Sequence, residues 1–220
     1  MPISLIPNQL QFLYEADFSP PMLEVVGSPQ QVGFIRRLCQ AFDIKLAEMT
    51  IHPQNLGRGH IFFSRWPKDA GSFSVSIGAD GVSINYFNPP SRESAWEPVE
   101  KLIEVMSESA EVICEKQSLK FQGHSAPLEI KPDEVISKFN VYENESLTSK
   151  GVTFTFKGPQ DNSQTFVVIS NSLLVPNGIY LLLETTYLQE IFLSKDNYDL
   201  CAAYLQADIL TRLELELVTQ

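Results

Sequence analysis

The stretch Ser72-Phe-Ser-Val-Ser-Ile-Gly-Ala-Asp-Gly-Val-Ser-Ile-Asn-Tyr-Phe87 decides the fold class of this 220-residue chain. Polar and apolar residues alternate strictly through Ser72–Ile77, which turns every second side chain to one face of a strand. Gly78-Ala-Asp-Gly81 supplies the glycines of a tight turn, and Val82–Phe87 then alternates again. The pattern therefore predicts an antiparallel hairpin with one apolar face.

The hairpin lies within a run of three strands followed by one helix. Ile61–Trp66 precedes it as an aromatic run of strand length, and Pro89-Pro90 ends its second strand. The next segment, Glu93–Glu115, has apolar residues at intervals of three and four, which predicts an amphipathic helix. Its predicted buried stripe comprises Trp96, Val99, Leu102, Ile103, Met106, Ala110 and Ile113.

The second half of the chain repeats this layout with different residues. Its predicted strands are Val152–Lys157, Thr165–Ser170 and Ile179–Tyr187, and its predicted helix is about Asp196–Leu213. The buried stripe expected for that helix comprises Leu200, Ala203, Tyr204, Ala207 and Leu210. Short meanders followed by a helix predict an α+β protein with two related βββα-like halves, antiparallel sheet, and long helices packed on one side.

Four further segments are interpreted as elements. Short strands are expected at Leu10–Tyr14 and Met22–Val26, and Leu119–Ile130 reads as a strand interrupted at Gly123. Between them, Ser28-Pro29 is typical of a helix start, and apolar residues at helical spacing continue to about Asp43.

The polar run Glu143–Lys150 predicts a linker at about 140–150. This gives an N-terminal α+β half at 1–140 and a C-terminal βββα half at 141–220, which could also pack as one compact domain. Near the end, Leu213–Leu217 alternates by two and fits either the last helical turns or a final strand.

Composition narrows the classes of partner. The chain has 27 acidic and 16 basic residues, giving a net charge of −11. Such a surface repels nucleic-acid phosphates and anionic lipid, and it suits a basic protein partner. Met1–Tyr14 lacks the features of a signal peptide, and no apolar run approaches the roughly 20 residues that cross a bilayer. We therefore expect a cytoplasmic protein.

The cysteines and histidines offer no metal or nucleophile signature. Cys39, Cys114 and Cys201 are far apart and lie in helix-like apolar surroundings, which favours unpaired, buried thiols in a reducing compartment. The three histidines have no His-x-His or His-x-x-x-His spacing. We therefore expect no metal, no cofactor and no identifiable catalytic residue.

Two sets of residues remain as candidates for binding. Arg58, His60 and His124 lie on predicted loops or strand ends and could line a ligand site in a cleft between the halves. The predicted helix Glu93–Glu115 carries a strongly acidic outer face that could dock a basic partner. Its candidate partner-binding residues are Glu97, Glu100, Glu104 and Glu108.

A family resemblance rests on layout and one short motif. The opening Pro20-Pro-Met-Leu-Glu-Val-Val26, the Trp96-containing helix after a hairpin, the strand Ser118-Leu-Lys-Phe121, and the closing strand and long helix together resemble a sporadically distributed bacterial family of conserved hypothetical proteins. The match spans most of the chain, but Lys120 and Gln122 stand where that family's middle strand carries arginine and asparagine. The resemblance implies a bacterial cytosolic setting and no particular chemistry.

Two hypotheses about function follow. The first is a non-enzymatic cytosolic protein-binding module, such as an adaptor, a chaperone-like or an antitoxin-like component, which uses exposed sheet edges and the acidic surface. A homo-oligomer is compatible with it. The alternative is a small-molecule-binding protein or an enzyme without a recognisable motif, with its site in a cleft between the two halves.

Overall fold

A computed structural model describes residues 3–26, 29–66, 71–109, 111–126, 131–139 and 151–217. The protein is a mixed α+β structure dominated by one large antiparallel sheet, which confirms the predicted fold class at that level. Among the described residues, no helix is long and apolar enough to cross a membrane. The predicted linker at 140–150 lies outside the described residues.

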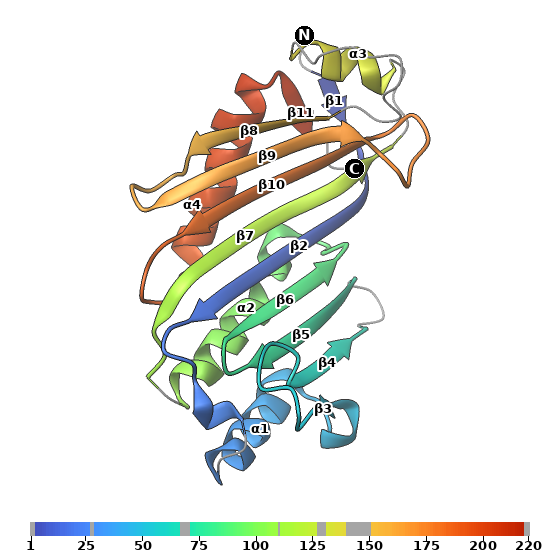
Figure 1. Cartoon of the computed structure of the whole chain (residues 1–220). Helices are drawn as coiled ribbons and strands as arrows, with labels where there is room; N and C mark the ends of the chain where they lie inside the picture. Colours follow the sequence, from blue (N-terminus) through green and yellow to red (C-terminus); the bar gives the residue numbers. More distant parts are fainter. Residues whose placement is uncertain are drawn as a thin grey trace. The chain divides into compact units, whose positions relative to one another are not determined.

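In the described part of the chain, nine strands form the sheet and two more form a small parallel pair (Figure 1). In spatial order the sheet contains β3 (Thr50–Ile51), β4 (Ile61–Arg65), β5 (Ser72–Gly78), β6 (Gly81–Phe87), β2 (Pro7–Phe18), β7 (Cys114–Ser125), β10 (Ile179–Tyr187), β9 (Ser163–Asn171) and β8 (Gly151–Lys157). Separately, β1 (Ile3–Leu5) pairs with β11 (Leu215–Leu217), so the end of the ambiguous segment at 213–217 is a strand.

The chain divides into two compact units, each assembled from separate stretches. Unit 1 consists of Met1–Gln11, Lys120–Thr185 and Asp199–Gln220, and unit 2 consists of Phe12–Leu119 and Thr186–Tyr198. This division differs from two consecutive halves at 1–140 and 141–220, because the long strands β2, β7 and β10 each contribute residues to both units.

Unit 2 contains the predicted hairpin and two helices. Strands β5 and β6 form the predicted hairpin around the predicted turn, with Gly78 opposite Gly81 and Val75 opposite Ile84. Helices α1 (Pro29–Phe42) and α2 (Arg92–Ser107) contact each other, and α2 lies against β6 (Figure 1). The short 3₁₀ turns η1 (Leu23–Val25) and η2 (Leu46–Glu48) flank α1.

The core of unit 2 is aromatic. Trp96 of α2 stacks on Tyr198, with ring centroids 5.0 Å apart, and meets Tyr14 of β2 edge-on at 6.0 Å. All three side chains are essentially inaccessible to solvent. Large rings bury much apolar area each, so this cluster anchors the helix to the sheet.

Unit 1 contains the strands β8, β9 and β10, backed by a helix (Figure 1). Helix α4 (Lys195–Tyr204) begins in unit 2 and continues through a π-helical turn, η3 (Leu205–Leu210). The short helix α3 (Pro132–Ser137) lies against β9. Alternate residues of β9 and β10 are buried, so one face of these strands is covered.

Two predicted elements are wrong in detail. Helix α2 ends at Ser107, so the predicted helix Glu93–Glu115 is too long. Ile113 is 40% exposed, and Cys114 opens strand β7, where its backbone amide donates to the Glu190 carbonyl. That non-local pairing recruits the end of the expected helix into the sheet. Met22–Val26 contains a 3₁₀ turn and no strand.

The buried stripe of the last helix also differs from the prediction. Leu200 is 45% exposed, and Ala203 and Ala207 also face solvent. Leu200 and Ala203 precede the π-helical turn, so the predicted stripe is already out of phase with the buried side within α4, and the wider turn alters the periodicity only from Leu205 onward. Of the predicted stripe Leu210 is buried, and the other buried positions of this segment are Tyr198, Cys201, Leu205, Ile209 and Leu213.

Candidate functional site

The strands of unit 1 present a partly apolar face on the side away from α4. The Thr165 and Thr185 hydroxyls lie 2.9 Å apart, and the Ser172 amide donates to the Gly178 carbonyl at 2.9 Å. Both contacts fit one antiparallel register of β9 and β10, in which Val168 lies opposite Leu182. We call this surface the open face of unit 1; it holds Phe166, Val168, Leu182 and the polar residues described below.

Exposure separates the two faces of these strands. Val167, Ile169 and Leu183 are buried against the helical side. Phe166 is 39% exposed, and its neighbours on the open face, Val168 and Leu182, are half-buried. Apolar residues are therefore available on a face that no described helix covers.

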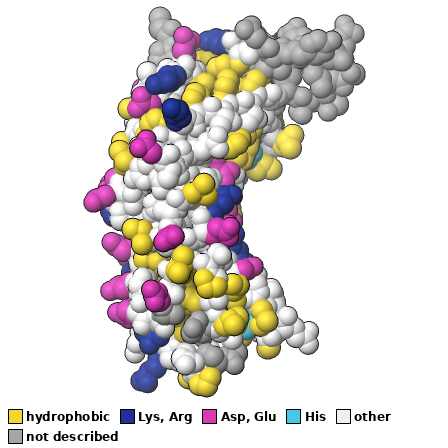
Figure 2. Space-filling model, turned by 60° about the vertical axis from the view of Figure 1, so that its left-hand side comes forward, with side chains coloured by type: hydrophobic (Ala, Val, Ile, Leu, Met, Phe, Trp, Pro, Cys, Tyr) yellow, Lys and Arg dark blue, Asp and Glu magenta, His cyan; other side chains and the backbone are white. Residues whose placement is uncertain are grey.

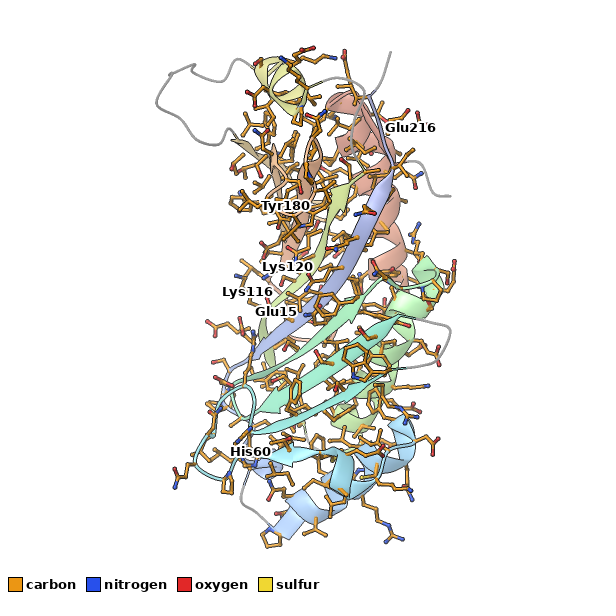
Figure 3. The ribbon with its side chains drawn as sticks, turned by 90° about the vertical axis from the view of Figure 1, so that its right-hand side faces the viewer. Glu15, His60, Lys116, Lys120, Tyr180 and Glu216 are labelled. Carbon is orange, nitrogen blue, oxygen red and sulfur yellow. The ribbon has the colours of Figure 1, made fainter. Side chains whose placement is uncertain are left out.

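A chain of hydrogen bonds crosses the open face beside these apolar residues. The Tyr180 hydroxyl donates to the Gln122 side-chain carbonyl at 2.7 Å, and the Gln122 amide donates to Gln11 Oε1 at 2.7 Å. The residues come from β10, β7 and β2, respectively. Figure 3 places Tyr180 on the side of the sheet away from α4. The network holds the polar border of the face in one arrangement.

The contacts of Ser172 indicate which tautomer the His124 ring adopts. Its Nδ1 lies 2.8 Å from Ser172 Oγ, which also accepts from the Leu174 and Val175 amides at 3.2 and 2.8 Å. Since those two amides occupy both lone pairs of the hydroxyl, the hydroxyl proton is donated to His124 Nδ1. The imidazole proton therefore sits on Nε2, as a donor for which the described residues supply no acceptor.

Burial keeps His124 and Tyr180 neutral. Desolvation lowers the pKa of His124 and raises the pKa of Tyr180, and their ring centroids lie 5.1 Å apart. Lys120 and Glu184, on neighbouring strands of the same face, are 3.5 Å apart. The open face is thus nearly charge-neutral within a chain whose net charge is −11.

The Ser172–His124 pair is not arranged for nucleophilic catalysis. A serine nucleophile needs a lone pair free for attack and a third group that orients the base. Here both lone pairs of Ser172 are held by backbone amides in the β9–β10 loop. The pair braces that loop.

Arg58 and His60 have structural roles in unit 2, whereas His124 belongs to unit 1. The Arg58 guanidinium pairs with Glu15 at 3.0 Å and with Asp17. The loop that carries it lies so close to the hairpin that a Cβ at Gly78 would collide with the Gly57 carbonyl. These contacts hold the loop on the edge of the β5–β6 turn.

His60 is only 3% exposed. Its Nε2 lies 2.7 Å from the Gln31 amide nitrogen, and its Nδ1 lies 2.9 Å from the Asn55 carbonyl. Figure 3 shows Glu15 and His60, and both belong to unit 2. His60 is therefore a satisfied buried side chain, and of the three ligand candidates only His124 lies on the open face of unit 1.

The predicted acidic face is present on α2. Glu97 pairs with Lys101 at 2.8 Å, whereas Glu100, Glu104 and Glu108 are exposed on the outer side of the helix. Figure 2 shows acidic side chains gathered along one side of the lower part of the view, with few basic side chains among them. The exposed glutamates therefore supply negative electrostatic potential, but no described side-chain contact fixes Glu100, Glu104 and Glu108 in a binding geometry.

A small apolar pocket lies in unit 1, on the other side of the sheet. Its volume is about 50 Å³, and its lining includes Leu5, Phe121, Ile179 and Leu181. A dry cavity that binds benzene measures about 150 Å³, so this pocket is too small for most metabolites. Within the described ranges, no group of three His, Cys, Asp or Glu side chains could hold a metal ion.

Sequence reasoning missed most of the open face, although one signal was available. Polar residues at Lys120, Gln122 and His124 alternate along β7 and indicate a solvent-facing side of the strand. Gln11, Ser172 and Tyr180 carry no such pattern. They join the site only because β2 and β10 pair on either side of β7.

Comparisons with known proteins add no family. No protein-family model matches the chain, and no curated protein matches it either. The resemblance to a bacterial conserved-hypothetical family therefore stays a prediction.

Proposed function

We propose that this protein is a non-enzymatic protein-binding module that docks its partner on the open face of unit 1. The observation that carries the proposal is the apolar group Phe166, Val168 and Leu182, partly exposed on a sheet face that no described helix covers. Protein interfaces typically combine such an apolar centre with a polar rim. The rim here is Gln122, His124 and Tyr180.

The chemistry of the face defines the partner. Its apolar centre would receive aromatic or aliphatic anchors, and the Nε2–H of His124 would donate to a carbonyl of the partner. The net charge of −11 favours a basic protein as the partner, and the exposed glutamates of α2 would add long-range attraction. A surface of this kind would serve an adaptor, a chaperone-like or an antitoxin-like component.

The alternative, a small-molecule-binding protein or an enzyme, has less support. The apolar pocket of unit 1 is about 50 Å³, and the candidate residues Arg58 and His60 are engaged in internal contacts. A ligand site needs several hundred cubic ångströms of concave space, on the order of 300 Å³ or more.

Two finer features belong to the proposal. The runs β4–β5–β6–α2 and β8–β9–β10–α4 share an order of elements, and we propose that they are related βββα units. The cysteines Cys39, Cys114 and Cys201 form no disulfide within the described chain, which supports a cytoplasmic setting.

The test uses two matched phenylalanines. Phe166 in unit 1 and Phe62 in unit 2 are each 39% exposed on a strand, so Phe62→Ser removes the same area from the other unit. Proteins retained by the full chain from its native cytosol are quantified for wild type, Phe166→Ser and Phe62→Ser. We expect Phe166→Ser to lose one specific retained partner, with unchanged melting temperatures for both variants.

Retention that is equal for the two variants would contradict docking on the open face. A thermal-shift screen with metabolites and metal ions addresses the alternative. A rise in melting temperature of more than a few degrees with one metabolite would favour a small-molecule function.

A further inference from the structure

Strand β8 is a regular edge strand with few features that protect it. It pairs with β9 over all seven residues, Gly151–Lys157, without a bulge. It ends the strand order of the sheet, and within the described residues no strand pairs with its outer side. It contains no proline and one charge, Lys157. Natural proteins usually block such edges with charges, bulges or proline, because unpaired backbone groups recruit another strand.

The hydrogen-bonding pattern identifies the backbone groups on the outer side. The Gly158 amide donates to the Ser163 carbonyl at 2.9 Å, which continues the β8–β9 register beyond Lys157. Along an antiparallel strand, the backbone N–H and C=O groups of successive residues point alternately toward the partner strand and away from it. The backbone groups of Phe156, Phe154 and Val152 therefore point toward β9.

The outward residues are therefore Gly151, Thr153, Thr155 and Lys157. The Lys157 carbonyl agrees with this assignment, because it accepts a bond from the Tyr204 hydroxyl rather than from β9. The threonines are exposed, so their amides and carbonyls are accessible at the edge.

We propose that β8 pairs antiparallel with β8 of a second copy of this chain, about a two-fold axis at Phe154. This register pairs the outward backbone groups of Thr153 and Thr155 and aligns Gly151 with Lys157, whose carbonyl already accepts from the Tyr204 hydroxyl. Each Thr153 lies opposite Thr155 of the second copy, and each Gly151 lies opposite Lys157 of the second copy. A two-fold interface needs such self-complementarity, because the same surface serves on both sides.

Side chains match on both faces of the paired strands. Threonine meets threonine on one face, a cross-strand pair that stabilises sheets. On the other face, half-buried Phe154 meets its own copy, and Val152 meets Phe156. Phe154 already contacts Phe139, with ring centroids 5.2 Å apart, so the second copy extends an existing aromatic cluster.

Charge does not oppose the pairing locally. The axis places Lys157 opposite Gly151, so no like charges meet along the strands. The net charge of −11 on each chain repels the second copy at long range, and salt screens that repulsion. Self-association should therefore strengthen as salt rises, opposite to the binding of a basic partner.

This inference deepens the proposed function and rests on it in one respect: pairing would make the module bivalent. Each copy would bring one open face, and a partner that engages both gains avidity without new contacts. The pairing itself does not require that a partner exists.

The first experiment compares Thr155→Pro with Thr155→Val by sedimentation equilibrium. Proline removes the outward amide of residue 155 and leaves the bonds to β9 intact, whereas valine keeps the amide and the strand preference. We expect a salt-strengthened dimer for wild type and Thr155→Val, and dimerisation weaker by about tenfold or more for Thr155→Pro. Equal melting temperatures would establish that both variants fold.

The second experiment tests the register with cysteine pairs. Paired residues of this kind have Cα atoms about 5.5 Å apart, within disulfide reach. Thr153→Cys mixed with Thr155→Cys should form a covalent dimer under mild oxidation, while either variant alone, like wild type, should not. Cross-linking of each single variant to the same extent as the mixture would overturn the register.

A wild-type chain that stays monomeric at about 100 µM and high salt would overturn the pairing, because a specific dimer should have a dissociation constant below that concentration. So would a Thr155→Pro protein that dimerises as wild type does. A monomer that still retains its partner through Phe166 would sink this inference and leave the proposed function standing. A dimer with no Phe166-dependent partner would support the pairing and contradict the proposed function.

Discussion

At the scale of residues, Gln117 is the polar centre of unit 2. Its Oε1 accepts from the Tyr14 hydroxyl at 2.8 Å and from the Leu193 amide at 2.9 Å, and its Nε2 donates to the Ile191 carbonyl at 2.7 Å. With 1% exposure, it has no water to replace these partners. One side chain thus ties β2 and β7 to the loop before α4.

We predict that Gln117→Leu destabilises the protein by about 2 kcal/mol or more, because it leaves the buried Tyr14 hydroxyl and Leu193 amide without their partner, while the Ile191 carbonyl still accepts from Gln189. Gln122→Leu is the matched control on the same strand, where water can reach the groups it frees. It should cost about 1 kcal/mol or less. Urea unfolding measures both, and equal costs would contradict the assigned burial.

His124 makes stability depend on pH. Burial lowers the pKa of His124 in the folded state. At a pH above the unfolded pKa of about 6.5, the imidazole is neutral in both the folded and the unfolded chain, so it does not reduce the free energy of unfolding. As the pH falls below about 6.5, the unfolded chain takes up this proton first, and stability decreases until the pH falls through the lower folded pKa.

The melting temperature of wild type should therefore fall more between pH about 7.5 and about 5.5 than that of His124→Asn, which cannot titrate. The imidazole signal followed by NMR should titrate below the ordinary midpoint of histidine. A midpoint above the ordinary value would contradict the prediction.

At the scale of elements, α2 separates a structural face from an electrostatic one. Leu102, Val99 and Met106 are inaccessible to solvent, while Glu100, Glu104 and Glu108 are exposed on the opposite side. The helix begins at a serine cap, where the Ser91 hydroxyl accepts from the Ser94 amide at 3.1 Å. Stability and partner attraction therefore depend on different residues of one helix.

We predict that Leu102→Ala costs about 2–5 kcal/mol of folding free energy, the usual range for a fully buried leucine. Glu104→Gln and Glu108→Gln should each stay within about 0.5 kcal/mol. If a basic partner uses this face, the glutamine variants will bind it more weakly, with a flatter dependence on salt. Loss of folding in the glutamine variants without loss of binding would rule out the docking role.

At the scale of the whole molecule, the cysteines report how the structure opens. Cys114 and Cys201 are buried, and desolvation, with a smaller effect of Asp17, raises the pKa of Cys114 to about 12. Cys39 is half-buried, and its pKa is raised chiefly by burial and also by Glu48. A thiol reagent reacts with the thiolate form of cysteine, and it must also be able to reach the sulfur atom.

Cys39 should therefore be labelled first in the native protein. Cys114 and Cys201 should react only in step with unfolding in urea, because labelling needs their surroundings to open. Mass spectrometry of peptides resolves the three sites. Rapid native labelling of all three would contradict the burial described here.

The sequence by itself determined the hairpins, because burial alternates along a strand wherever one face is covered. The predicted strands Ile61–Trp66, Ser72–Ile77 and Ile179–Tyr187 correspond to β4, β5 and β10 to within a residue at each end. The α+β class followed from the same local signal. The acidic character of the chain likewise followed from a count of its acidic and basic residues.

Tertiary structure alone decided what depends on pairing between distant segments. Strands β2 and β7 each run for 12 residues because they pair within the sheet, and that pairing ended α2 early and recruited Cys114. The same pairing assembled the open face from β2, β7 and β10. His60 is buried by contacts with Gln31 and Asn55, neither of which lies in a strand. Hydrogen bonds between strands that are far apart in the chain leave no local periodicity, so the site could not be read from the sequence.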